Sequence, residues 1–217
     1  RAMILVGQYD SPYVRRVAIS LKLAGLQFTR DTRSVFADAD EMRRINPLGR
    51  IPSLVLDDSE VLIDSGAILD HIDETIGPDR SLLPARGAAR RKALRIVALA
   101  TGAIDKAGAV AYERMLRPQE TIYMPWIGRC LTQLASALAA LDALPLTPWY
   151  LGARLMQPDI TVGVMLGYLE LRVADAFPAG RYPALETLSA ACQALPEFAA
   201  TVPTADETMP ARGTGVA

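Results

Sequence analysis

The order of hydrophobic and polar positions divides the chain into a region of short elements and a region of long helices. In the first region, residues 3–7 are a continuous apolar run typical of a buried strand. Ser11-Pro12 is a helix start, and the apolar face that follows it ends at Gly25. The pattern then predicts a strand, a short charged helix, a two-stranded hairpin and a helix, at residues 27–32, 37–45, 53–56, 61–63 and 65–76.

This β-α-β-α-β-β-α order is the thioredoxin-like pattern, with the first two strands expected to be parallel. Residues 77–84 have the composition of a linker, and no strand pattern follows them. Helices are expected at residues 88–117, 120–144 with a kink at Pro125, 158–176 as a buried central helix, 182–195 and 196–201, before a loose tail at 203–217. We therefore predict an α/β domain at residues 1–80 and an all-helical domain at residues 87–217.

The stretch around Ile51-Pro52 organises the first region. Asn46-Pro47 breaks the preceding helix, and Ile51-Pro52 stands just before a strand, where a cis peptide bond is plausible. A cis bond would turn the backbone of Ile51 outward, as an edge to which an extended peptide can pair. Ser65, the expected N-cap of the next helix, lies beside it and would offer free N–H groups to a carboxylate. Together these features suit a small peptide that carries an α-carboxylate.

Three short motifs carry a resemblance to a known family: Ser11-Pro12-Tyr13, Gly49-Arg50-Ile51-Pro52 and Asp64-Ser65. In combination with the chain length and the helical second half, they resemble the glutathione transferases, most closely the serine-type bacterial members. The resemblance implies a thioredoxin-like N-terminal domain that binds glutathione, followed by an all-helical C-terminal domain that shapes the site of an electrophile.

The resemblance implies that Ser11 is the catalytic hydroxyl, which donates a hydrogen bond to the glutathione sulfur. A free thiol has a pKa near ~8.5, so a hydroxyl donor, a helix N-terminus and a nearby cation all favour its thiolate. The alternative for Ser11 is a simple N-cap, and the two roles are compatible. Tyr9 is the rival hydroxyl. Arg15 shares a helix face with Ser11 and would raise the local positive potential, unless it forms a structural salt bridge.

The resemblance also implies a glutathione-binding set. Asp64 and Ser65 match the acidic-serine pair that holds the γ-glutamyl end, with capping and a surface charge as their structural alternatives. Ile51, next to Pro52, would bind through its backbone. Arg50 is a candidate for the glycyl carboxylate or a solvated loop charge, and the neighbouring candidates for that end are Arg33 and Ser34.

An apolar pocket for the electrophile is expected from aromatic and methionine side chains, which suit flexible apolar ligands. At helical spacing, such residues more often belong to the core. The candidates are Tyr13, Tyr112, Met115, Tyr123 and Trp126. His71, Cys130 and Cys192 are interpreted as structural. In the central helix, Asp159 of a capping box is present, but Met156 occupies the cap position, so the reciprocal bonding is expected to be lost.

Charge, histidine and cysteine counts and apolar runs limit the partners, sites and location that we expect. The 217 residues carry a net charge of −1, which gives no electrostatic reason to expect nucleic acid or an acidic membrane surface as a partner. The chain has one histidine and two distant cysteines, which argues against a metal site, a Ser-His-Asp triad or a disulfide framework. Residues 3–6 are too short an apolar run for a signal peptide, and no apolar run of ~18 residues is present, so we expect a cytoplasmic protein.

The resemblance implies a homodimeric glutathione S-transferase that conjugates glutathione, as co-substrate, to a small hydrophobic electrophile. One alternative is a glutathione-dependent isomerase or dehalogenase, which would use the same thiolate. Another is a non-catalytic binding or regulatory protein of the same fold, which predicts a lost thiol hydroxyl or a damaged γ-glutamyl site. A cysteine-type thiol transferase is disfavoured because no cysteine lies near residue 11.

Overall fold

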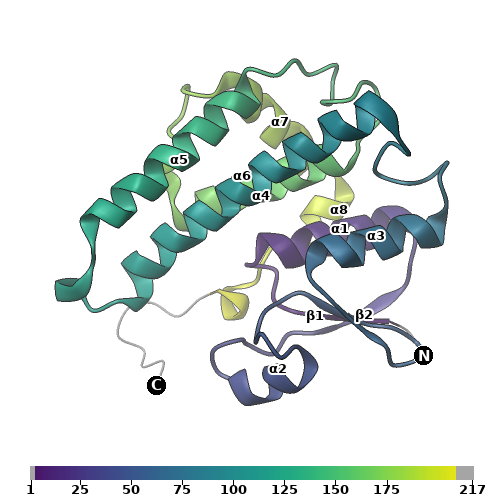
Figure 1. The fold of residues 1–217 in the computed structure, drawn as a ribbon, viewed down its shortest axis with the longest axis horizontal. Coiled ribbons are helices and arrows are strands. Elements are labelled where there is room, and N and C mark those ends of the chain that lie inside the picture. Colours follow the sequence, from purple (N-terminus) through teal and green to yellow (C-terminus); the bar gives the residue numbers. More distant parts are fainter. Residues whose placement is uncertain (1–2, 209–217) are drawn as a thin grey trace. The chain divides into compact units, whose positions relative to one another are not determined.

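A four-stranded mixed sheet organises the first part of the computed structural model, which describes residues 3–208 (Figure 1). The strands β1 (Met3–Val6), β2 (Phe28–Asp31), β3 (Ser53–Val55) and β4 (Val61–Ile63) lie in the order β2-β1-β3-β4. β1 pairs in parallel with β2 and antiparallel with β3, and β3 and β4 form an antiparallel hairpin. The predicted thioredoxin-like domain is confirmed.

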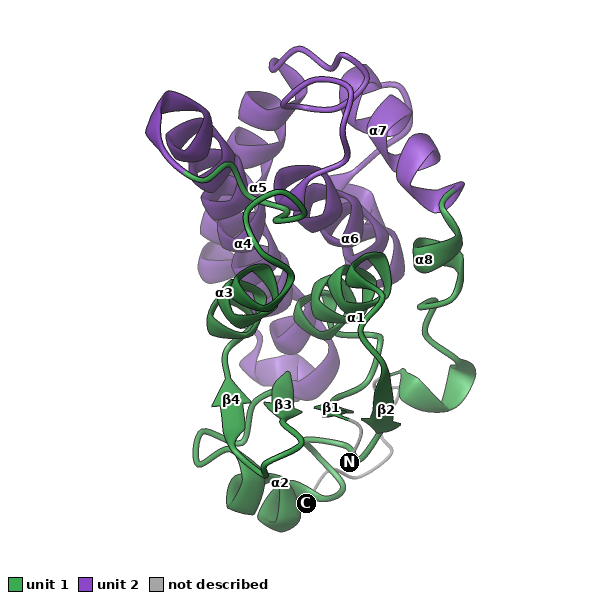
Figure 2. Ribbon diagram, turned by 90° about the vertical axis from the view of Figure 1, so that its right-hand side faces the viewer, with its two compact units in different colours: residues 1–85, 195–210, 214–217 green, residues 86–194, 211–213 purple. Residues whose placement is uncertain are grey.

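Helices cover both faces of this sheet. α1 (Pro12–Ala24) and α3 (Ser65–Ile76) pack against each other on one face, and the short α2 (Ala39–Ile45) lies toward the other (Figures 1 and 2). The core between sheet and helices is apolar and fully buried, and it includes Leu5, Val17, Leu21, Leu54, Ile68 and Ile72. Burying such side chains is the main stabilising contribution to a domain of this size.

The chain divides into two compact units, drawn in different colours in Figure 2. Of the described residues, unit 1 contains 3–85 with 195–208, and unit 2 contains 86–194. Unit 2 is helical: α4 (Gly87–Leu116) packs against α5 (Met124–Asp142) and α6 (Gln157–Arg172), and α7 (Pro183–Gln193) packs against α5 and α6. α6 is buried almost all round, as expected for the central helix.

Residues 195–208, which the sequence assigns to the end of the helical domain, group with unit 1 instead. We call them the C-terminal segment. It contains α8 (Pro196–Ala199), which packs on α1, and a 3-10 helix, Ala205–Glu207. The prediction of a loose tail is wrong for residues 203–208, because Glu207 is only 3% exposed and is hydrogen-bonded within unit 1. The remainder of the predicted tail, residues 209–217, lies outside the described residues.

Two helix boundaries differ from the sequence prediction. The helix expected at residues 120–144 is split into a 3-10 helix, Gln119–Thr121, and α5. Pro125 lies in the first turn of α5, where a missing N–H costs nothing, so it causes no kink. α6 ends at Arg172, and residues 174–176 form a separate 3-10 helix.

The start of α6 retains the bond that the sequence led us to expect lost. The carboxylate of Asp159 accepts the Met156 N–H at 2.9 Å and the Tyr150 N–H, also at 2.9 Å. The carboxylate needs no hydroxyl at the cap to make these bonds, because both donors are backbone groups. Burial raises the pKa of Asp159, and the backbone donors oppose that rise.

Among residues 3–208, no helix has the length and apolar character needed to cross a membrane. In the same residues, no three histidine, cysteine, aspartate or glutamate side chains gather in a way that could hold a metal ion.

Candidate functional site

Ser11 stands at the N-terminus of α1, where the positive end of the helix dipole favours an anion. Its backbone is extended, and its Oγ accepts the Val14 N–H at 3.4 Å. The side chain is half-buried. Because the oxygen serves as an acceptor in this cap, its O–H proton is left to donate to another atom. Ser11 therefore caps the helix and keeps the donor that the thiolate role requires.

Gly7 brings the segment of Ile51 against the first turn of α1. Its φ is +139°, and a Cβ added to it would lie 2.5 Å from Cγ2 of Val14 and 3.1 Å from Cβ of Ile51. Only glycine fits such an approach without displacement. The loop that ends in Ser11 and the loop that ends in Pro52 thus meet at Gly7.

The loop before Pro52 is held by the buried side chain of Asn46. Its Nδ2 donates to the Arg50 carbonyl at 2.8 Å, and its Oδ1 accepts the Leu48 N–H at 3.0 Å. The Ile51-Pro52 peptide bond is cis, as the sequence suggested. Arg50 itself is exposed on this loop. Asn46 therefore fixes the backbone that delivers Ile51 to the site.

Asp64, and not Ser65, is the N-cap of α3, so the predicted cap is wrong. Oδ1 of Asp64 accepts the Gly66 N–H at 2.7 Å, and the residue has a φ of +71°, which side-chain-bearing residues rarely adopt. Residues held in such a conformation gather at functional sites. Ser65 is instead turned inward and is 3% exposed, because its hydroxyl binds a side chain of α1.

That side chain is Arg16, a residue absent from the sequence prediction. Its Nε and Nη2 donate to Oγ of Ser65 at 3.1 and 2.7 Å, and its guanidinium lies over the ring of Tyr13 at 5.7 Å. Burial lowers the pKa of Arg16, while Tyr13 and Asp64 raise it. With both bonds accepted by Oγ, the Ser65 O–H proton is available to donate to a carboxylate, and a buried cation stands behind it.

The spacing in the sequence carried a weak signal for Arg16. It lies three residues after Tyr13 and four before Ser20, so the three share one face of α1. Only the packing of α1 on α3 shows that this face meets Ser65.

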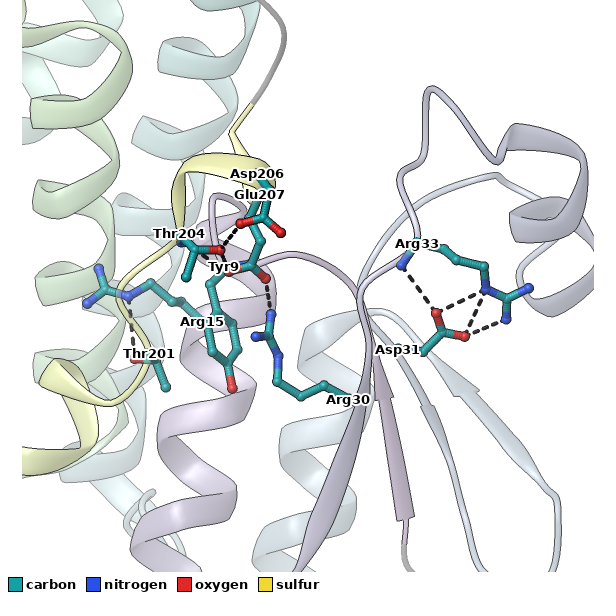
Figure 3. Close-up of polar contacts among 9 residues, drawn as sticks. All are labelled: Tyr9, Arg15, Arg30, Asp31, Arg33, Thr201, Thr204, Asp206 and Glu207. Carbon is teal, nitrogen blue, oxygen red and sulfur yellow. Dashed lines mark hydrogen bonds and ion pairs between the residues drawn. The ribbon is translucent and has the colours of Figure 1, made fainter.

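Arg15 is engaged elsewhere. Its Nε donates to Oγ1 of Thr201 at 3.4 Å (Figure 3). Its Nη2 donates to the Phe198 carbonyl at 3.1 Å, and the guanidinium lies over the Phe198 ring. These contacts direct Arg15 to the C-terminal segment, and its influence on the thiolate stays a prediction.

Tyr9, the rival hydroxyl, is 5% exposed and belongs to the core of unit 1. The guanidinium carbon of Arg30 lies 3.4 Å from the centroid of its ring. Burial raises the pKa of Tyr9, Arg30 lowers it and Glu207 raises it again. The half-exposed hydroxyl of Ser11 is therefore the better placed of the two to meet a ligand.

Arg33 and Ser34 bind residues that are close to them in the sequence. Arg33 pairs with Asp31 and with Glu41, and Oγ of Ser34 accepts the N–H groups of Phe36 and Ala37. Figure 3 shows Arg33 directed toward Asp31.

The residues expected at the electrophile pocket lie in both units. Tyr13 belongs to unit 1, whereas Tyr112 and Met115 lie near the end of α4, and Tyr123 and Trp126 lie at the start of α5. Tyr112 is 48% exposed, Tyr123 63% and Trp126 39%, which argues against a core role for these three. Cys130 and Cys192 are buried, and neither forms a disulfide within residues 3–208. The pocket itself stays a prediction.

Comparison with known proteins agrees with the fold. Residues 5–80 match the family model described as "Glutathione S-transferase, N-terminal domain". A glutathione S-transferase of Methylobacterium radiotolerans, crystallised with glutathione sulfonate, superposes with a TM-score of 0.89 at 31% identity and covers 98% of this chain and 99% of its own. The chain belongs to the glutathione S-transferase family.

Two curated relatives place the chain within this family without fixing its reaction. The GST-like protein YibF of Escherichia coli is 34% identical over 116 residues, which are 54% of this chain and 56% of that protein. The maleylacetoacetate isomerase of Pseudomonas aeruginosa is 31% identical over 150 residues, 65% of this chain and 69% of that enzyme. The chain thus spans 56% of the length of the first relative and 69% of the length of the second.

Proposed function

We propose that this protein is a serine-type glutathione S-transferase, which binds glutathione in unit 1 and conjugates it, through its thiolate sulfur, to a small hydrophobic electrophile. The observation that carries the proposal is the joining of three predicted motifs in one unit. Gly7 brings the first turn of α1 against Ile51, and the Arg16–Ser65 hydrogen bonds tie α1 to the start of α3.

In this proposal, the Ser65 hydroxyl and the N-terminal N–H groups of α3 bind the α-carboxylate of the γ-glutamyl end, and Asp64 pairs with its α-amino group. The backbone of Ile51 pairs with the cysteinyl part of glutathione. Arg50 is the candidate cation for the glycyl carboxylate. Each of these roles comes from the family resemblance, and the positions of Asp64, Ser65 and Ile51 support it.

The chemistry begins with loss of the thiol proton to solvent. The Ser11 O–H donates to the resulting thiolate, and the positive end of α1 stabilises it further. The thiolate then attacks an electrophilic carbon, a carbon–sulfur bond forms, and the leaving group departs with the electron pair of its bond to that carbon.

The test compares Ser11→Ala with Ser11→Thr, which keeps a hydroxyl. We expect Ser11→Ala to bind glutathione normally but to lose at least about tenfold in turnover below the thiol pKa, because less of the thiol is ionised. Ser11→Thr should recover part of the rate. An alanine variant with unchanged affinity and full activity would rule out the assignment of Ser11.

A glutathione-dependent isomerase is the second candidate, favoured by the likeness to maleylacetoacetate isomerase. The same thiolate would add to a conjugated double bond, and after rotation about the resulting single bond the sulfur would leave as thiolate. Screening halogenated aromatic electrophiles beside cis-configured conjugated dicarboxylates separates the two reactions. Glutathione binding without turnover in either screen would instead favour the non-catalytic binding protein.

We also propose a homodimer located in the cytoplasm, on the family resemblance. Light scattering coupled to size-exclusion chromatography tests the dimer, which predicts twice the 23.4 kDa of the chain.

A further inference from the structure

The C-terminal segment binds the chain on both sides of Ser11. Two residues before Ser11, the Tyr9 N–H donates to Oε1 of Glu207 at 3.3 Å. Four residues after it, Arg15 donates to Thr201 and to the Phe198 carbonyl. Figure 3 shows Tyr9 and Arg15 beside Glu207 and Thr201, which lie far from them in the sequence. Ser11 therefore lies in a stretch whose two ends are tied to the same segment.

Glu207 uses both oxygens of its carboxylate. Oε1 also forms an ion pair with Arg30 of β2, and Oε2 accepts the N–H of Thr204 at 3.2 Å. Its side chain is 4% exposed. The bond from the Thr204 N–H belongs to a capping box at the start of the 3-10 helix. The C-terminal segment therefore orients the same carboxylate that binds Tyr9.

Hydrogen bonds hold the loop between β1 and α1 at Gly7, Tyr9 and Ser11. The Gly7 N–H donates to the Asp31 carbonyl at 2.8 Å, and the Ser11 N–H donates to the Gln8 carbonyl at 3.2 Å. Between these two bonds, Tyr9 is held by Glu207 through its N–H and by Arg30 across its ring. A shift of Tyr9 would therefore be transmitted through Gln8 to Ser11.

A buried carboxylate is expensive unless it is paired and hydrogen-bonded. Glu207 meets that condition by binding a backbone N–H in the loop before Ser11 and a cation on the neighbouring strand. An exposed carboxylate would need none of these partners, so the burial of Glu207 points to a role in the loop.

We propose that Glu207 is a positioning residue, which holds the loop of Tyr9 so that the Ser11 hydroxyl meets the sulfur of bound glutathione. This inference rests on the proposed function, in which Ser11 is the donor to the thiolate. Glu207 itself touches neither glutathione nor the electrophile in this account. Its effect passes through the Tyr9 N–H.

The experiment measures the thiol pKa of bound glutathione from the thiolate absorbance as a function of pH, in the full chain. We expect Glu207→Ala to raise that thiol pKa by about one unit and to lower kcat more than it changes KM, because a displaced hydroxyl stabilises the anion less. The matched control is Asp206→Asn. Asp206 is the residue directly before Glu207, and its exposed carboxylate accepts a hydrogen bond from the Thr204 hydroxyl. Its substitution should leave the thiol pKa at the parent value.

Ser11→Ala in the same titration separates this inference from the proposed function. If Ser11→Ala raises the thiol pKa and a folded Glu207→Ala does not, the positioning role is overturned and the proposed function stands. If the parent fails to bind glutathione, both are overturned. Should Glu207→Ala not fold, Glu207→Met decides, because it keeps the length of the side chain but has no oxygen to accept the Tyr9 N–H. A raised thiol pKa then supports the role, and a parental value overturns it.

Discussion

Replacing Gly7 with alanine should destabilise unit 1 and weaken its ligand site together. The new Cβ would lie 2.5 Å from Cγ2 of Val14, closer than real carbon contacts allow, and 3.1 Å from Cβ of Ile51. Neither neighbour can rotate away freely, because both are β-branched and Val14 is fully buried. The backbone must therefore move.

The magnitude combines two costs and one gain. Holding a side-chain-bearing residue at a φ of +139° costs about 1–3 kcal/mol, and overpacking a buried site costs about 1–3 kcal/mol more. The smaller conformational freedom of alanine in the unfolded chain returns about 0.4–1 kcal/mol. We expect Gly7→Ala to lower the free energy of unfolding by roughly 2–4 kcal/mol.

Gly25→Ala is the matched control. Gly25 ends α1 with a φ of +69°, but a Cβ there would meet nothing within 4 Å. Its substitution should cost only about 1 kcal/mol, from backbone strain alone. In urea unfolding followed by circular dichroism, the Gly7 variant should therefore have a midpoint lower than the Gly25 variant by roughly 1 M.

The Gly7 variant should also bind glutathione more weakly, because relief of the clash separates the first turn of α1 from Ile51. Equal midpoints for the two variants would refute the close approach at Gly7. A destabilised Gly7 variant that binds glutathione like the parent would refute its link to the ligand site.

Two further predictions follow from buried charges. Arg16→Met should weaken glutathione binding by about tenfold, because a charge-assisted donor behind Ser65 is lost. The free energy of unfolding should stay equal or rise, since no ion pair of Arg16 is found in residues 3–208. Calorimetry tests the affinity and urea unfolding tests the stability, and a large loss of stability would contradict the account. Burial raises the folded-state pKa of Asp159, so its contribution to stability is fully present below the ordinary carboxyl pKa and is lost as pH rises through the raised value. The unfolding free energy of the parent minus that of Asp159→Asn should accordingly fall across this window, and a difference independent of pH would show that the pKa is not raised.

Local signals in the sequence were enough for most of unit 1. The apolar run of β1, the Ser11-Pro12 start of α1 and the Ile51-Pro52 break each specify their own element through nearest neighbours in the chain. The parallel pairing of β1 with β2 then follows from the intervening helix. These features agree with the structure because no distant contact is needed to decide them.

Two of the errors, at Ser65 and in the predicted tail, occur where a distant contact decides. Ser65 has the chemistry of an N-cap, but Arg16 draws its hydroxyl inward and leaves the cap to Asp64. Thr204 and Glu207 have the spacing of a capping box, and that signal was available in the sequence. Its meaning was not, because the partner of Glu207 is Tyr9, 198 residues earlier. Packing between elements, and not local propensity, sets such contacts.

The central claim is that unit 1 recognises the γ-glutamyl end of glutathione at Asp64 and Ser65. Substituting Ser65 would leave the buried Arg16 without its acceptor, so the decisive change is better made in the ligand. We would titrate the parent protein by calorimetry with glutathione and with cysteinylglycine, which has the same thiol but lacks the γ-glutamyl group. The account predicts binding of glutathione with a Kd between about 1 μM and 1 mM, and binding of cysteinylglycine at least about a hundredfold weaker. Equal affinities, or no binding of glutathione at concentrations of about 10 mM, would contradict it.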